Sequence, residues 1–324
     1  MILIYFLLTV GFCLLLIKAT DILTDCVHHF SSFTVLNKFA ATALLIALVN
    51  ALPELMVGIN AVLAGKSALA FGTILGSNIA NLSLVVGGAA LVSGSVAVSG
   101  EWLRQDTMNI FLTALLPISL LVDGRISRLE GLILIAIYIF YAISLLRGRQ
   151  QGGYYPQEGD YRLRRLLLTK NKQKKITWWF GWFIVGGIML IVSGEMVVKY
   201  GLALANILSI PAFLIGLLMA VGTTLPELFF EIEAIRKHEA AMVWGNLSGQ
   251  LMANSALTLG ILSLISPIVL PDGLTAYLLT ISSFVLVCIL FWIFTKTKKK
   301  LERWEGAALV GVYLVFMAVE WLTK

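Results

Sequence analysis

The sequence predicts an all-α polytopic membrane protein, with ten transmembrane helices arranged as two inverted five-helix repeats. Three observations predict it: an apolar composition, a series of long apolar stretches, and a motif that recurs at a constant distance along the chain. Apolar residues make up 59% of the 324 residues and charged residues only 13%. A soluble protein has roughly a quarter of its residues charged, so the main solvent of this chain is lipid.

The apolar stretches number five, then a polar break, then five more. The first stretch lacks a positively charged start and a small-residue cleavage pattern, so we interpret it as a retained helix and not as a signal peptide. We expect a first repeat over 1–146, a basic loop over 147–177 and a second repeat over 178–324. In order, the apolar stretches cover 2–17, 39–63, 68–93, 108–122, 129–146, 178–198, 211–232, 242–265, 274–294 and 306–322.

Lysine and arginine gather in two places, 147–175 and 296–303. If ten spans alternate in direction, both clusters lie on the same side of the membrane. Basic loops stay in the cytoplasm, so the central loop is predicted to be cytoplasmic and both termini to lie outside. Because the positive charges lie between apolar runs and not over a folded surface, the net charge of +6 does not indicate a nucleic-acid partner. The expected partner is the lipid bilayer.

The repeat is carried by two motifs. Leu52-Pro53-Glu54-Leu55 recurs as Leu225-Pro226-Glu227-Leu228, and Ala80-Asn81 recurs as Ala253-Asn254. The offsets agree, since 227 − 54 = 173 and 254 − 81 = 173. Five spans are an odd number, so the second copy enters the membrane from the opposite side. Inverted repeats of this kind are typical of transporters that bind their substrate near the bilayer midplane.

The repeated glutamates are the strongest functional signal. A charged side chain at membrane depth costs about 2.5–3.5 kcal/mol on insertion scales, so an idle pair is improbable. Pro53 lacks the amide hydrogen for the carbonyl of Val49, and Pro226 likewise frees that of Gly222. We therefore expect a break or kink in each helix, which leaves carbonyl oxygens beside a carboxylate. Hard cations prefer such oxygen ligands.

Other polar residues follow the glutamates at helical spacing. Residues four apart share one face of a helix, so four helices each offer a short polar stripe. Two negative charges match one divalent ion or a few monovalent ions, and the absence of nearby His and Cys disfavours Zn or Cu. Glycines at 72, 76, 245 and 249 indicate close helix packing. The four stripes are Asn50 with Glu54, Thr223 with Glu227, Ser77 with Asn81, and Gln250 with Asn254.

These motifs resemble those of the sodium/calcium exchanger family, in its compact prokaryotic form. The first pair reads Val49-Asn50-Ala51-Leu52-Pro53-Glu54 and Gly222-Thr223-Thr224-Leu225-Pro226-Glu227. The second pair runs over 72–81 and 245–254. The resemblance implies alternating-access exchange of Ca²⁺ against Na⁺ or H⁺ in the cytoplasmic membrane of a bacterium or archaeon, with the spans near 2–17 and 178–198 sliding across the other eight.

The resemblance also implies a metal site. Glu54 and Glu227 would be the central Ca²⁺ ligands, and the backbone carbonyls of Ala47 and Ala220 would help bind Na⁺. The side chains expected to complete the site are Asn50, Ser77, Asn81, Thr223, Thr224, Gln250 and Asn254.

Several positions depart from the family pattern. Asn50 and Gln250 carry amides where the family usually has a hydroxyl, and Asn254 stands where many relatives carry Asp, which weakens any case for K⁺ co-transport. The leading hypothesis is a non-enzymatic Ca²⁺/Na⁺ antiporter that works as a monomer without a bound cofactor. H⁺/Ca²⁺ exchange, or exchange of another divalent cation, is the alternative. An intramembrane enzyme is a remote one, because the sequence lacks Gly-x-Gly-Asp, Gly-x-Ser-Gly and paired-His motifs.

Overall fold

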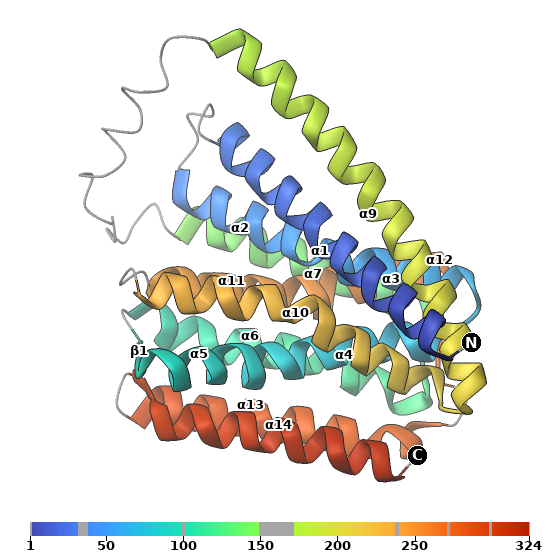
Figure 1. The fold of residues 1–324 in the computed structure, drawn as a ribbon. Coiled ribbons are helices and arrows are strands. Elements are labelled where there is room, and N and C mark those ends of the chain that lie inside the picture. The colour runs from blue at the N-terminus through green and yellow to red at the C-terminus, as the bar shows by residue number, and fades with distance from the viewer. Residues whose placement is uncertain are drawn as a thin grey trace.

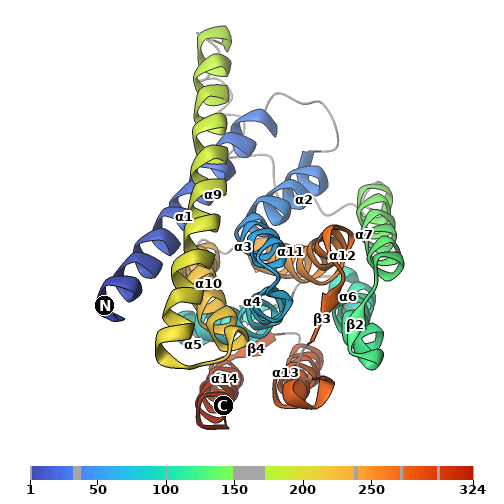
Figure 2. The same cartoon turned by 90° about the vertical axis from the view of Figure 1, so that its right-hand side faces the viewer.

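The computed structural model describes residues 2–31, 38–98, 101–148, 172–236, 240–270, 273–297 and 300–323. Nearly all of these residues are helical, and four short strands pair into two two-stranded sheets (Figures 1 and 2). The elements are α1 (Ile2–Ser31), α2 (Lys38–Asn50), α3 (Leu52–Leu63), α4 (Ser67–Ala80), η1 (Asn81–Val85), α5 (Val86–Ser93), β1 (Ser95–Ala97), α6 (Glu101–Leu120), η2 (Leu121–Asp123), β2 (Arg125–Ile126), α7 (Arg128–Gly148), α9 (Lys172–Leu208), α10 (Ala212–Arg236), α11 (Ala240–Met252), η3 (Ala253–Thr258), α12 (Leu259–Ile265), β3 (Ile268–Val269), η4 (Leu274–Tyr277), α13 (Leu278–Thr297), β4 (Lys300–Glu302) and α14 (Arg303–Thr323).

The described helices fit a membrane. Eight of them are long and apolar enough to cross a bilayer, and the bent pair Leu44–Asn50 and Leu52–Leu63 makes a ninth. A shorter apolar helix, Ile110–Asp123, lies where the fourth span is expected, so the described chain is compatible with ten spans. Burial is inverted relative to a soluble protein, since Phe140 is 74% exposed while Glu54 is 1% exposed. The chain is a multi-pass membrane protein.

The two halves run in opposite directions. Helix α1 starts at the end of the bundle marked N and runs away from it, whereas its counterpart α9 runs towards that end (Figure 1). Each short sheet pairs one strand from each half: β1 with β4, and β2 with β3, both antiparallel. Strand β3 is the repeat of β1, since 268 − 95 = 173. As α6 runs from β1 to β2, the β1–β4 sheet and the β2–β3 sheet lie at opposite ends of the helices.

Helices α1 and α9 form a layer of their own. They are 30 and 37 residues long and lie side by side along one side of the bundle (Figures 1 and 2). Their shared contact includes a hydrogen bond from Cys26 Sγ to the carbonyl of Trp179 at 3.4 Å. Both helices extend well beyond the apolar stretches 2–17 and 178–198 that the sequence shows.

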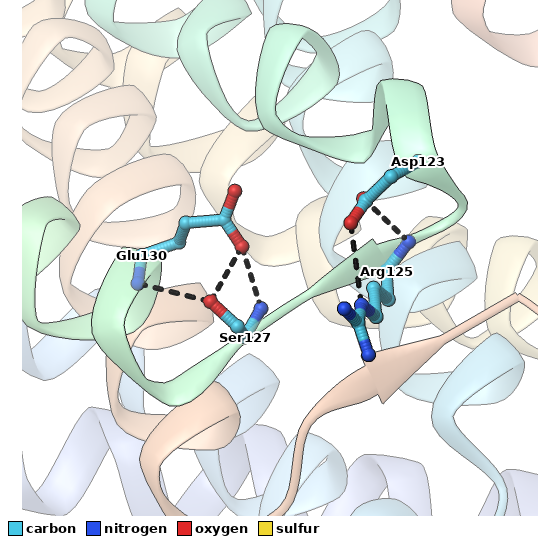
Figure 3. Close-up of polar contacts among 4 residues, drawn as sticks. All are labelled: Asp123, Arg125, Ser127 and Glu130. Carbon is cyan, nitrogen blue, oxygen red and sulfur yellow. Dashed lines mark hydrogen bonds and ion pairs between the residues drawn. The ribbon is translucent and has the colours of Figure 1, made fainter.

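At the β2–β3 end, a polar turn starts α7 (Figure 3). The Glu130 carboxylate accepts hydrogen bonds from the backbone N–H and the hydroxyl of Ser127, both at 2.7 Å, and the Ser127 hydroxyl accepts the backbone N–H of Glu130 at 3.4 Å. This reciprocal pair is a capping box, which satisfies donors that a helix start leaves free. Just before it, Asp123 accepts the backbone N–H and Nε of Arg125, both at 3.2 Å.

The predicted glycine packing holds at three of the four positions. A side chain at Gly72 would meet the carbonyl oxygen of Phe213, 2.5 Å from the Cβ position, so α4 and α10 touch backbone to backbone. A repeated contact follows, because Gly76 packs on Ala220 and Gly249 packs on Ala47, with 249 − 76 = 173 and 220 − 47 = 173. The prediction is wrong at Gly245, where no described atom lies within 4 Å of the Cβ position.

The two prolines act differently. In the first copy the helix breaks at Ala51, and α2 and α3 meet at 43°. Pro53 then lies in the first turn of α3, where a missing N–H costs nothing. In the second copy α10 is one helix from Ala212 to Arg236, so of the expected break or kink at Pro226 the break is absent. Helix α10 packs on α4 in its first half and on α5 further along.

Candidate cation-binding site

Glu54 lies where three helices meet. Its Oε1 accepts hydrogen bonds from the hydroxyls of Ser77 on α4 and Thr223 on α10, both at 2.9 Å. These two donors fix one edge of the carboxylate. The other oxygen, Oε2, is buried and has no hydrogen-bond partner in the described part of the chain. Glu54 therefore presents one free, oriented oxygen inside the bundle.

A chain of amides crosses between the copies. Asn50 Nδ2 and Gln250 Nε2 both donate to Asn246 Oδ1, at 2.9 and 3.1 Å. Asn81 Nδ2 then donates to Gln250 Oε1 at 2.7 Å. These bonds connect the stripes on α2, η1 and α11 through Asn246. Together with the Thr223–Glu54 bond, they bring the four polar stripes into one region, as expected from the repeat.

Glu227 is half-buried and lies beside this chain. Its carboxylate adjoins the Gln250 side chain and is close enough to Glu54 and Glu231 for their charges to repel it. Its Oε2 is buried without a hydrogen-bond partner in the described residues. One carboxylate from each copy thus lies near the other, and no lysine or arginine is buried in the part of the chain that the structure describes.

Asn254 belongs to a second small network. Its Nδ2 donates to Asn78 Oδ1 at 3.3 Å, and Asn78 Nδ2 donates to Ser255 Oγ at 2.8 Å. Asn81 and Asn254 each lie in a π-helical turn, η1 or η3. Such turns are often found at functional sites because they re-aim side chains. Here the repeat places one turn in each copy, and each carries an asparagine whose Oδ1 has no described partner.

Five buried oxygens of this region lack a hydrogen-bond donor among the described residues. All are acceptors, two from amides and three from carboxylates. Buried polar groups are normally paired, so a cluster of unpaired acceptors calls for a ligand that supplies positive charge. Carboxylate and amide oxygens are the ligand set of hard cations such as Ca²⁺. The atoms are Glu54 Oε2, Asn81 Oδ1, Glu227 Oε2, Glu231 Oε2 and Asn254 Oδ1.

Three of the predicted ligands make other contacts. The Thr224 hydroxyl donates to the carbonyls of Ala220 and Val221 in its own helix, at 3.0 and 3.2 Å. The Ala220 carbonyl also lies 3.1 Å from the Thr223 hydroxyl, where it competes with Glu54 Oε1 for the single hydroxyl proton. The Ala47 carbonyl accepts the backbone N–H of Ala51, at 3.1 Å.

Sequence reasoning missed part of the network. Asn246 lies four residues before Gln250, on the same helix face, so the spacing that selected Gln250 also indicates Asn246. Asn78 gave no such signal, because its repeat counterpart is the apolar Leu251 (78 + 173 = 251). Only the packing of η3 against α4 brings Asn78 to Asn254.

Comparison with known proteins agrees with the predicted fold and with the family that the motifs resemble. The Inner membrane protein YrbG of Escherichia coli K12 is 32% identical over 85% of this chain and 84% of its own length. The sodium/calcium exchanger MaX1 of Methanosarcina acetivorans is 24% identical over 96% of this chain and 99% of its own. A solved structure of the sodium-calcium exchanger NCX_Mj shares the fold, with a TM-score of 0.65, 23% identity, and 98% of this chain and 99% of that one covered.

A family model places the chain among these proteins. The model of the sodium/calcium exchanger proteins matches residues 4–147 and 178–322, which include both copies of the repeat. The chain belongs to the sodium/calcium exchanger protein family.

Proposed function

We propose that this protein is a secondary active antiporter that exchanges Ca²⁺ for Na⁺ by alternating access, with its ion site midway across the membrane. The observation that carries the proposal is the set of buried, unpaired carboxylate and amide oxygens around Glu54 and Glu227. The relative MaX1 is named a sodium/calcium exchanger, and NCX_Mj crystals were soaked with Na⁺ together with Ca²⁺ or Sr²⁺. Both support this choice of ions.

The charge of the site explains exchange. Glu54 and Glu227 carry two negative charges, which one Ca²⁺ neutralises in surroundings where an uncompensated charge is expensive. Several Na⁺ ions neutralise the same pair. Ca²⁺ and Na⁺ therefore compete for one set of oxygens. The site changes its access from one side of the membrane to the other only when these oxygens are occupied. This competition couples the flow of one ion to the flow of the other.

We name the ligands together as the central cage. It comprises the carboxylates, amides and hydroxyls of the four polar stripes. The backbone carbonyls of Ala47 and Ala220 contribute oxygens to Na⁺, and Thr224 lies next to Thr223 in the same part of the cage. Its side chains are Asn50, Glu54, Ser77, Asn81, Thr223, Glu227, Gln250 and Asn254.

Access would change by movement of α1 and α9. These helices form a separate layer over the rest of the bundle, so they can slide without unpacking the α4–α10 contact. We place the β1–β4 end in the cytoplasm, because the basic segment 147–175 connects helices at that end. Both termini then lie outside.

Flux into proteoliposomes tests the proposal. Radiolabelled Ca²⁺ uptake is measured with Na⁺, K⁺, Li⁺ or H⁺ supplied in turn on the opposite face. We expect uptake driven by Na⁺, and its loss in Glu54→Gln and in Glu227→Gln, because each change removes one of the two charges that hold Ca²⁺. Glu233→Gln, an exposed carboxylate on α10, is the control and keeps wild-type uptake.

Two results would contradict the proposal. Uptake driven by a pH gradient without Na⁺ would replace Na⁺ by H⁺ as the driving ion. Gradient-driven uptake that persists in both glutamine variants would remove the carboxylate pair from the transport site.

A further inference from the structure

Glu231 is a further buried carboxylate next to the pair that defines the cage. It follows Glu227 by one turn of α10, towards Arg236 and the β1–β4 end. Its side chain is 1% exposed, and its Oε2 has no hydrogen-bond partner among the described residues. An ionised carboxylate at such a position needs a positive partner, because its desolvation is otherwise uncompensated.

Glu231 is connected to the cage through Asn246. The Asn246 side chain lies beside the Glu231 carboxylate. On its other side, Asn246 Oδ1 accepts hydrogen bonds from Asn50 and Gln250, both predicted cage residues. An ion at Glu231 would therefore lie next to the amides of the cage and in electrostatic contact with Glu227.

The position is nonetheless separate from the cage. Among the described residues, no three acidic, histidine or cysteine side chains are close enough together to hold a single metal ion. The described, buried charged side chains are all glutamates, so no lysine or arginine balances Glu231 from inside the bundle. A divalent ion in the cage satisfies Glu54 and Glu227 and leaves one negative charge at Glu231.

We propose that Glu231, oriented by the Asn246 amide, is the ligand of a second cation subsite, which holds an alkali ion such as Na⁺ while a divalent ion occupies the central cage. A single carboxylate matches one positive charge, and a divalent ion there would leave a charge uncompensated. The subsite lies on the β1–β4 side of the cage, where an ion from that side arrives first. The proposal rests on Ca²⁺ binding in the cage, as the proposed function requires.

Equilibrium dialysis of the purified full-length protein tests this subsite. Radiolabelled Na⁺ is counted per protein at a Ca²⁺ concentration that saturates radiolabelled Ca²⁺ binding. Wild type should retain about one Na⁺ per protein beside its Ca²⁺, as the charge balance requires. Glu231→Gln should lose that Na⁺ while its Ca²⁺ stoichiometry stays at the wild-type value, which also shows that the variant is folded.

Two further variants sharpen the test. Glu231→Asp keeps the charge but withdraws it by one methylene, so it should retain Na⁺ with weaker affinity. Glu233→Gln, which removes an exposed carboxylate two residues along α10, should retain Na⁺ as wild type does.

The outcomes are distinct. Wild-type protein that binds Ca²⁺ but retains no Na⁺ overturns the subsite, because Glu231 then binds a proton or no exchangeable cation. Equal Na⁺ retention in Glu231→Gln overturns it as well. Absence of Ca²⁺ binding to wild type would instead refute the proposed function, and the subsite with it.

Discussion

Removing the Thr223 hydroxyl tests how the cage orients Glu54. Thr223 and Ser77 donate to the same carboxylate oxygen, Oε1, at 2.9 Å each, which leaves Oε2 without a described partner and open to the proposed ion. A hydrogen bond to a charged group contributes about 1.5–3 kcal/mol. Because each 1.4 kcal/mol is a factor of ten, Thr223→Val should weaken Ca²⁺ binding by about ten- to a hundredfold. Valine keeps the branched shape, so packing changes little.

The assay is equilibrium binding of radiolabelled Ca²⁺ to purified protein. Ser77→Ala should show a loss of similar size, and the double variant should lose less than the sum of the two free energies, since both hydroxyls share one acceptor. Thr73→Val is the matched control, because the Thr73 hydroxyl lies one turn from Ser77 but donates only to the Leu69 carbonyl, at 3.0 Å. Wild-type affinity in Thr223→Val, or an equal loss in Thr73→Val, would refute this reasoning.

Two further predictions concern the scaffold. Gly72→Val should lower the melting temperature in detergent, because its Cβ would meet the Phe213 carbonyl; overpacking of this kind costs about 1–3 kcal/mol. Gly245→Val, at the equivalent position of the second copy, should lower the melting temperature far less. Equal shifts in the two variants would contradict the close α4–α10 contact. Ser127→Ala should lower the free energy of unfolding by about 1 kcal/mol, because it removes the hydroxyl that caps α7; thermal unfolding measures the loss. An unchanged melting temperature would show that Glu130 caps the helix alone.

The sequence predicted the helical fold and the meeting of the polar stripes because a fixed offset ties each residue of one copy to its partner in the other. Glu54, Asn81 and Gln250 lie in one region of the structure for this reason. What the repeat could not predict is where the copies differ. The helix breaks at Ala51 but not at Pro226, and Gly72 packs tightly while Gly245 does not.

Those differences arise from packing between elements distant in sequence. Gly72 packs tightly because α4 lies against the first half of α10, a contact between the two copies. Similarly, the hydrogen bond between Asn78 and Asn254 depends on η3 approaching α4, which no local pattern encodes. Glu231 is visible in the sequence only as an acid one turn from Glu227, and its burial and its contact with Asn246 required the structure.

Locating the ion tests the central claim most directly. Crystals grown in Ca²⁺ and soaked with Sr²⁺ would show the bound ion by its anomalous scattering. The account predicts a peak between α3 and α10 at coordination distance, about 2.3–2.6 Å for Ca²⁺, from oxygens of both Glu54 and Glu227. A peak that contacts only one of these carboxylates, or lies at the surface of the bundle, would contradict it.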